Sequence, residues 1–236
     1  FSHHRKKLAV IFQNDDDQLL FLKSRIINES QAYKIKGSGV DLKQYSYTPE
    51  PEGQKIKVLL TARMIVEKGI FILTDAAMKL KEQYKDRVQF LLCGGLDDNP
   101  VAIKEDELQA VCDGDYIKWL GYRTDILNLL KDCHIVAFPS YYKEGLPKSL
   151  IEAAAIGRPI VTTNSVGCKD TVVEGYNGFL VPVKDSDALA DRLKILIENK
   201  HLRWEMGKNS RRLAEKYFSI DDVVTKHLEI YGKILK

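Results

Sequence analysis

From Lys57 to the end of the chain, short apolar segments alternate with longer amphipathic ones. The segment 57–61 carries a continuous apolar run rather than an alternating one, which is typical of a strand buried on both faces. We expect strands at 57–61, 88–93, 117–120, 134–138, 159–163 and 178–181, and helices at about 68–83, 101–112, 147–156, 186–198, 201–217 and 221–235. Such alternation requires right-handed crossovers and a parallel sheet covered on both faces. The sequence therefore predicts a doubly wound α/β domain, which binds ligands at the carboxyl ends of its strands.

The first 50 residues follow a different pattern. Two strands are expected at 8–12 and 32–36, with a helix at about 15–25 between them. The three aspartates at 15–17 favour a helix start there, because carboxylates suit the positive end of a helix dipole. A segment with two prolines and a glycine at 49–53 then reads as a linker. The chain begins at Phe1 inside a basic segment, and from this we expect it to be a portion of a longer protein.

Composition excludes several classes of protein. The chain is 44% hydrophobic and 29% charged, as in an ordinary globular protein, and its net charge of +3 leaves no strongly basic field for nucleic acid. The four cysteines form no C-x-x-C pair, which argues against a zinc site and favours a reducing, cytosolic compartment. No segment approaches the ~20 apolar residues of a membrane-spanning helix.

One segment carries most of the chemical information. After the strand at 134–138, a loop bears Glu144 and Gly145, and Pro147 suits the first position of the following helix. The first amides of a helix have no intrahelical partner and can bind an anion such as a diphosphate. Because proline has no N–H, the expected donors are the amides of Gly145, Leu146, Lys148 and Ser149.

Two carboxylates flank this predicted anion site. Glu144 precedes the helix, and Glu152 lies in its second turn. Each can accept hydrogen bonds from hydroxyl groups. A sugar on one side and a ribose on the other, joined by a diphosphate, would fit this arrangement.

The Glu144-x7-Glu152 spacing, followed by an alanine-rich turn, Gly157 and Pro159, resembles the retaining glycosyltransferases of the GT-B fold, the "group 1" family. The resemblance covers about residues 37–236. Four further segments are similar to family motifs in family order: 37–41 at the entry to the C-terminal domain, 61–69 at a strand-to-helix turn, 119–123 beside the nucleobase, and 175–181 at a later strand.

The resemblance implies a role for each motif. Arg63 and Lys68 would neutralise the diphosphate leaving group without a metal ion or other cofactor. Glu152 would hold the ribose hydroxyls, and Glu144 would orient a hydroxyl of the donor sugar. The backbone of Gly121, Tyr122 and Arg123 would meet the base.

The resemblance also implies a reaction. It is the transfer of a glycosyl group, with retention, from a nucleoside diphosphate sugar, taken as a UDP-sugar, to a glycan or lipid-linked acceptor. The residue usage is similar to that of bacterial enzymes building surface polysaccharides. The parent enzyme would be cytoplasmic, or peripheral on the inner face of the membrane.

Part of the family pattern is missing from this chain. A full enzyme has an N-terminal Rossmann domain that binds the acceptor, and residues 1–50 read as its remnant and linker. Residues 51–236 would form the nucleotide-sugar-binding domain, which alone would bind UDP weakly and transfer nothing.

The last helix carries an apolar stripe (Val224, His227, Leu228, Tyr231 and Leu235) that would be exposed and favour self-association. His134 stands where relatives carry an acidic residue, which we interpret as a structural variation.

Several alternatives stay open on the residues alone. The acids at 15–17 and 97–98 could hold a metal, although acids at helix starts and in turns are far commoner. Gly94-Gly95 follows a strand but lacks the full dinucleotide motif. Cys168 is expected to pack rather than to react. The alternative functions are a sugar-nucleotide-binding module without turnover, and a GT-B epimerase or phosphorylase.

Overall fold

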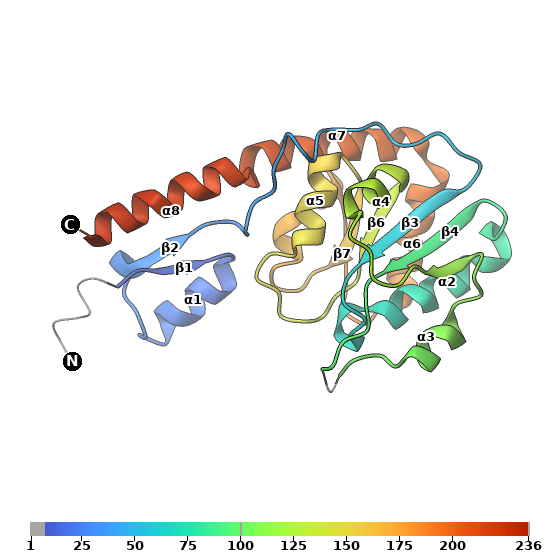
Figure 1. Cartoon of the computed structure of the whole chain (residues 1–236), viewed down its shortest axis with the longest axis horizontal. Coiled ribbons are helices and arrows are strands. Elements are labelled where there is room, and N and C mark those ends of the chain that lie inside the picture. Colours follow the sequence, from blue (N-terminus) through green and yellow to red (C-terminus); the bar gives the residue numbers. More distant parts are fainter. Residues whose placement is uncertain (1–7, 100, 236) are drawn as a thin grey trace.

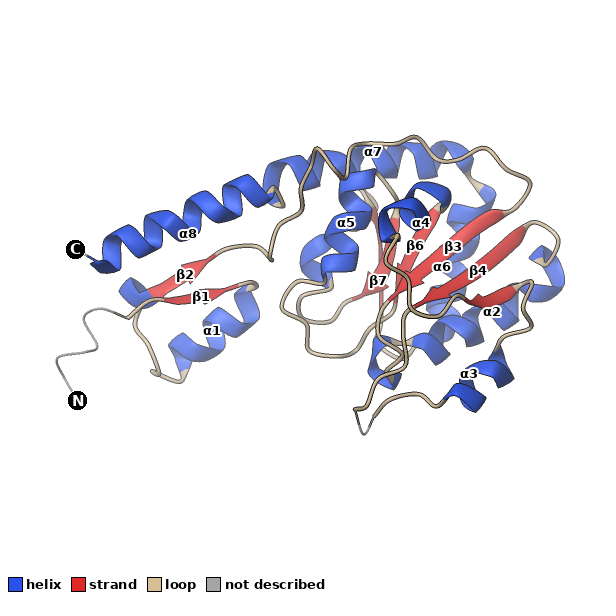
Figure 2. Ribbon diagram, in the orientation of Figure 1, coloured by secondary structure: helices blue, strands red, loops and turns tan. Residues whose placement is uncertain are grey.

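A six-stranded parallel sheet forms the centre of the computed structural model, which describes residues 8–99 and 101–235. Its strands are β3 (Ile56–Thr61), β4 (Val88–Cys93), β5 (Ile117–Trp119), β6 (Ile135–Phe138), β7 (Ile160–Thr163) and β8 (Gly178–Val181). They lie in the order β5-β4-β3-β6-β7-β8, and every neighbouring pair is parallel (Figure 2). The predicted doubly wound α/β fold is confirmed.

Helices cover both faces of this sheet. They are α2 (Ile70–Tyr84), α3 (Glu105–Val111), α4 (Ile126–Asp132), α5 (Lys148–Ile156), α6 (Ser186–Glu198) and α7 (Lys200–Tyr217). Along β3, Val58 and Leu60 pack into the core beneath α2, α3 and α6, whereas Leu59 packs into the core beneath α4, α5 and α7. The strand is buried on both sides because successive side chains point to opposite faces. This explains why the sequence shows a continuous apolar run.

Residues 8–35 form a small lobe beside the main sheet. Strands β1 (Val10–Phe12) and β2 (Ala32–Lys34) pair in parallel, with α1 (Asp15–Lys23) between them. The closing helix α8 (Ile220–Leu235) runs from α7 out to this lobe (Figure 1). Its residues Val223 and Ile230 are buried there against Ile35. Two residues of the expected apolar stripe, Val224 and Tyr231, each directly follow one of these buried residues in the sequence.

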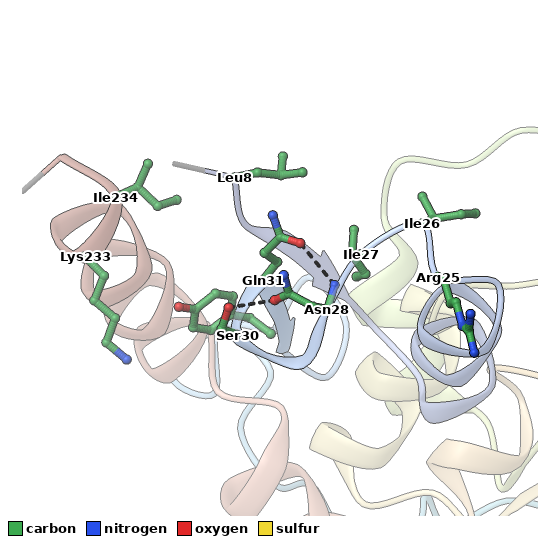
Figure 3. A pocket seen from close by; sticks show the side chains of 10 residues that line it. Leu8, Arg25, Ile26, Ile27, Asn28, Ser30, Gln31, Lys233 and Ile234 are labelled. Atoms are coloured by element: carbon green, nitrogen blue, oxygen red, sulfur yellow. Dashed lines mark hydrogen bonds between the residues drawn. The ribbon is translucent and has the colours of Figure 1, made fainter. Parts of the chain in front are cut away.

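Four of the five side chains of that stripe are exposed: Val224, Leu228, Tyr231 and Leu235. A separate cavity of about 530 Å³ lies between the lobe and the end of α8. Figure 3 shows Leu8, Ile27 and Ile234 around it, and two hydrogen bonds of Asn28 beside them. None of the predicted site residues lines this cavity.

One expected helix start was wrong, and one helix was not expected. Helix α3 begins at Glu105 rather than near 101, because residues 101–103 are held against the turn after β3. There the amide of Val66 donates to Val101 O at 3.1 Å, and Ile103 donates to Met64 O at 2.9 Å. Helix α4 was not predicted, since its seven residues run almost directly into β6.

His134 joins the starts of β3 and β6. It is buried, its amide donates to Lys57 O at 2.9 Å, and its ring Nδ1 accepts from Lys57 N at 3.1 Å. Burial lowers the pKa of His134 below its usual 6.5, although the negative charge of Glu50 opposes the shift. The imidazole therefore acts as a neutral acceptor in the folded chain.

This burial gives a pH dependence. The unfolded chain takes up the His134 proton first as pH falls, so stability should be full above pH 6.5 and should be lost as pH falls through the lowered pKa of the folded state. Urea unfolding at pH 7.5 and pH 5.5 measures this loss. In His134→Asn the drop between the two pH values should be smaller. An equal drop in both proteins would show that His134 does not carry it.

Candidate functional site

The turn after β3 places Lys68 at the carboxyl edge of the sheet. A short 3-10 helix (Val66–Lys68) ends at Gly69, which has a φ of 81° and begins α2. A Cβ at Gly69 would lie 2.2 Å from Pro139 O, so only glycine allows this close approach to the loop after β6. The turn containing Lys68 therefore packs directly against the loop that leads to Glu144.

Hydrogen bonds fix these two segments to one another. The amides of Tyr141 and Tyr142 both donate to Glu67 O, at 2.9 and 3.1 Å. The Ser140 hydroxyl lies 3.2 Å from the same carbonyl and 3.1 Å from Glu144 Oε1. Thr163, at the end of β7, in turn donates to Ser140 O. The position of the Glu144 loop is thus set by three neighbouring strands.

Lys68 and Glu144 form an ion pair at the centre of the site. Lys68 Nζ lies 2.5 Å from Glu144 Oε1, and the two side chains are only 11% and 12% exposed. The ammonium group also lies 4.8 Å from the centre of the Tyr142 ring. The structure thus brings together two residues that the sequence placed 76 positions apart.

The first turn of helix α5 lies beside this pair. The helix begins at Lys148, with Pro147 as its N-cap rather than its first residue as predicted. Pro147 O accepts from the amides of Leu150 and Ile151 at 3.1 and 3.3 Å. The amides of Lys148 and Ser149 lie in the first turn, where a helix offers donors without intrahelical partners.

The Leu146 amide differs from the expectation of a free donor. It donates to the side chain of Gln13, with its nitrogen 2.9 Å from Gln13 Oε1. This amide is therefore already satisfied in the structure.

Two adjacent hollows share residues 61–63 of the turn after β3. The first, of about 200 Å³, is lined by Thr61, Ala62, Arg63, Lys68, Phe138, Glu144, Pro147, Lys148 and Ser149. The second, of about 430 Å³, is lined by Thr61, Ala62, Arg63, Cys93, Gly94, Gly95, Tyr122, Arg123, Thr124 and Ile126. Arg63 lies between them and pairs with Asp97, with Nη1 2.8 Å from Oδ2.

Glu152 lies one turn along α5, outside the lining of both hollows. It is 7% exposed and 3.7 Å from Lys148 Nζ, and burial raises its pKa. The Tyr45 phenol, from the segment before β3, lies close to this carboxylate. Burial and the charge of Glu152 raise the pKa of Tyr45 to about 12, so the phenol keeps its proton beside the carboxylate.

The turn expected beside the base borders the second hollow. Gly121 has a φ of 67° and accepts from Gly94 N at 2.9 Å. Tyr122 is 77% exposed, and Arg123 makes two hydrogen bonds to Asp125 at 2.6 and 2.7 Å. The turn is thus held by backbone and side-chain hydrogen bonds, with an exposed aromatic ring at Tyr122.

Sequence reasoning missed Gln13, Tyr45 and Ser140 as parts of this site. Ser140 was visible as a polar residue two positions after β6. Gln13 and Tyr45 belong to segments with no recognisable motif, so no sequence signal marked them.

Cys168 is fully buried as expected, and burial raises the pKa of its thiol. Among the described residues, no helix combines the length and apolarity needed to cross a bilayer.

Comparison with solved structures supports the fold. A glycosyltransferase from Rickettsia africae superposes with a TM-score of 0.86 and 24% identity over 100% of this chain and 65% of that chain. Anabaena Alr3699/HepE, solved with UDP and glucose, superposes with a TM-score of 0.79 and 22% identity over 95% of this chain and 62% of that one.

Sequence comparison gives the family. An N,N'-diacetylbacillosaminyl-diphospho-undecaprenol alpha-1,3-N-acetylgalactosaminyltransferase from Campylobacter jejuni is 30% identical over 96% of this chain and 60% of that protein. The chain thus spans well under two thirds of that relative. The family model for glycosyl transferases group 1 matches residues 46–213. The chain belongs to the glycosyl transferases group 1 family.

Proposed function

We propose that this chain supplies the donor site of a retaining glycosyltransferase that uses a nucleoside diphosphate sugar, a UDP-sugar by our assignment. One observation carries the proposal. The buried pair of Lys68 and Glu144 lies beside the first turn of α5, and both line one hollow with Arg63. Cations, free amides and a carboxylate therefore meet at the carboxyl edge of the sheet, where such folds bind ligands.

The diphosphate would lie between the two cations and the start of α5. Lys68 and Arg63 stabilise the negative charge that develops on the leaving group, since fixed charges in a protected site act more strongly than in water. Lys148, at 67% side-chain exposure, can turn toward the same group. The amides of Lys148 and Ser149 complete the phosphate contacts.

The two glutamates then serve opposite ends of the donor. Lys68 and Ser140 both contact Glu144 Oε1, so we assign Oε2 to a hydroxyl of the transferred sugar. Glu152, oriented by Tyr45, is assigned to the ribose. The second hollow, bordered by Tyr122 and Arg123, takes the base.

The name of one relative supports a proposal about the acceptor. The Campylobacter jejuni relative is named for a diphospho-undecaprenol acceptor, which supports a lipid-linked or glycan acceptor here. We propose that residues 51–236 form the donor domain and residues 1–50 belong to an acceptor domain and linker. On this proposal the parent enzyme is cytoplasmic, or peripheral on the inner face of the membrane. The exposed stripe of α8 is an additional candidate surface for self-association.

A thermal-shift series with UDP-, GDP- and ADP-sugars tests the proposal. Ligand binding raises the unfolding temperature by mass action, so UDP-sugars should stabilise the chain selectively. Selective stabilisation by GDP- or ADP-sugars would correct the nucleotide. A folded chain that no sugar nucleotide stabilises would argue against the donor site itself.

A further inference from the structure

The turn between β1 and α1 lies against the loop that carries Glu144. Asn14, at 2% exposure, accepts from Asp17 N at 2.8 Å as the N-cap of α1, and its amide group donates to Gly145 O at 3.2 Å. An ion pair of 2.8 Å between Asp16 and Lys169 ties the same turn to the segment after β7. Figure 1 shows this turn facing the loop before α5. The small lobe is therefore anchored at the proposed donor site.

This anchoring places Gln13 over one particular backbone amide. Gln13 Oε1 accepts from Leu146 N at 2.9 Å, across 133 positions of sequence. A Cβ at Gly145 would lie 2.3 Å from the same oxygen, so glycine is what allows the carboxamide to approach this closely. The amide that Gln13 occupies follows Glu144 by two residues and precedes the first turn of α5 by two.

We propose that Gln13 competes with the donor: its carboxamide occupies the Leu146 amide while the site is empty, and a diphosphate oxygen of the sugar nucleotide replaces it on binding. This inference rests on the proposed function. One backbone N–H has a single proton to donate, so the carboxamide oxygen and a donor oxygen cannot both take this amide at full strength. The donor must therefore break an existing hydrogen bond to gain this one.

The proposal predicts opposite effects for two substitutions at Gln13. Gln13→Ala removes the competitor, so UDP should bind about 2- to 10-fold more tightly, as expected for one neutral hydrogen bond. Gln13→Glu keeps the shape of the side chain but holds the amide through a charge-assisted bond and repels the diphosphate. UDP should then bind about 10-fold more weakly or worse. A residue that only supported the loop would weaken binding in both variants.

Calorimetric titration with UDP tests this on the whole chain. The wild type, both Gln13 variants and Gln18→Ala, a control in α1, are compared after thermal unfolding shows that each is folded. Tighter binding by Gln13→Ala, weaker binding by Gln13→Glu and unchanged binding by Gln18→Ala support the proposal. A Gln13→Ala variant that binds UDP equally or more weakly than a wild type that does bind overturns it.

Amide exchange adds a direct readout at Leu146. Exchange of this amide should be slow in the wild type, faster in Gln13→Ala, and slow again when that variant is saturated with UDP. Unchanged exchange in Gln13→Ala overturns the inference while leaving the donor site intact. If neither the wild type nor Gln13→Ala binds UDP, the proposed function fails, and the competition fails with it.

Discussion

Replacing Lys68 by methionine is expected to lower the free energy of unfolding by about 2–4 kcal/mol. The substitution leaves the Glu144 carboxylate, which is 12% exposed, without its cation and with Ser140 beside it. Breaking a buried pair by removing one partner is costly, because the remaining charge stays away from water without compensation. Urea unfolding at neutral pH measures the loss.

The same substitution should also weaken UDP binding. Lys68 is assigned to the diphosphate, and a charge-assisted hydrogen bond is worth about 1.5–3 kcal/mol, or roughly 10- to 100-fold in affinity. Glu144→Gln should change nucleotide affinity little, since this side chain is assigned to the sugar. In a complete enzyme we expect it to reduce kcat sharply.

Lys148→Met is the matched control for Lys68→Met. Lys148 lines the same hollow, but it is 67% exposed and 3.7 Å from its carboxylate partner. The 3.7 Å contact of this exposed ammonium group with Glu152 is longer than the Lys68–Glu144 contact, so this variant should lose less stability than Lys68→Met. Equal stability losses in the two variants would contradict the central, buried position that we assign to Lys68.

Glu152→Ala is expected to weaken UDP binding by about 1.5–3 kcal/mol, roughly 10- to 100-fold. The carboxylate is assigned to the ribose hydroxyls, and its removal leaves no acceptor for them at that place. Tyr45→Phe should weaken binding less, because it removes only the phenol that orients the carboxylate. Calorimetric titration with UDP measures both effects.

A nucleotide without the ribose hydroxyls isolates the Glu152 contact. With 2′,3′-dideoxyuridine diphosphate, the wild type and Glu152→Ala should bind with nearly equal affinity. The hydroxyls and Glu152 would then be energetically coupled, as in a double-mutant cycle. A loss of the same size with both nucleotides would refute the ribose assignment.

The central sheet could be predicted because its strands are buried on both faces. Val88–Cys93 is apolar at five of its six positions and lies between Arg87 and Gly94, and β4 has the same bounds. The start of α3 could not be predicted in this way, since backbone hydrogen bonds of Val101 and Ile103 to the turn after β3 delay it. Tertiary contacts, rather than local propensity, decide that boundary.

The part of the candidate site that lies on one continuous segment could be predicted from the sequence. The spacing of Glu144, Pro147 and Glu152 locates the start of α5 without any structure. The contacts of Gln13 with Leu146 and of Tyr45 with Glu152 connect distant segments that share no periodicity. Only the folded chain shows that the lobe before residue 36 lies against the predicted donor loop.

Calorimetric titration of the folded chain with UDP, UMP and uridine tests the central claim most directly, because the three ligands differ only in their phosphates. The cations and amides around the start of α5 should make UDP the tightest ligand, with UMP weaker and uridine weakest. Added salt should reduce the advantage of UDP, since charge attraction carries it. No binding at millimolar UDP, or affinity for UDP no greater than for uridine, would contradict a diphosphate site between Lys68, Arg63 and α5.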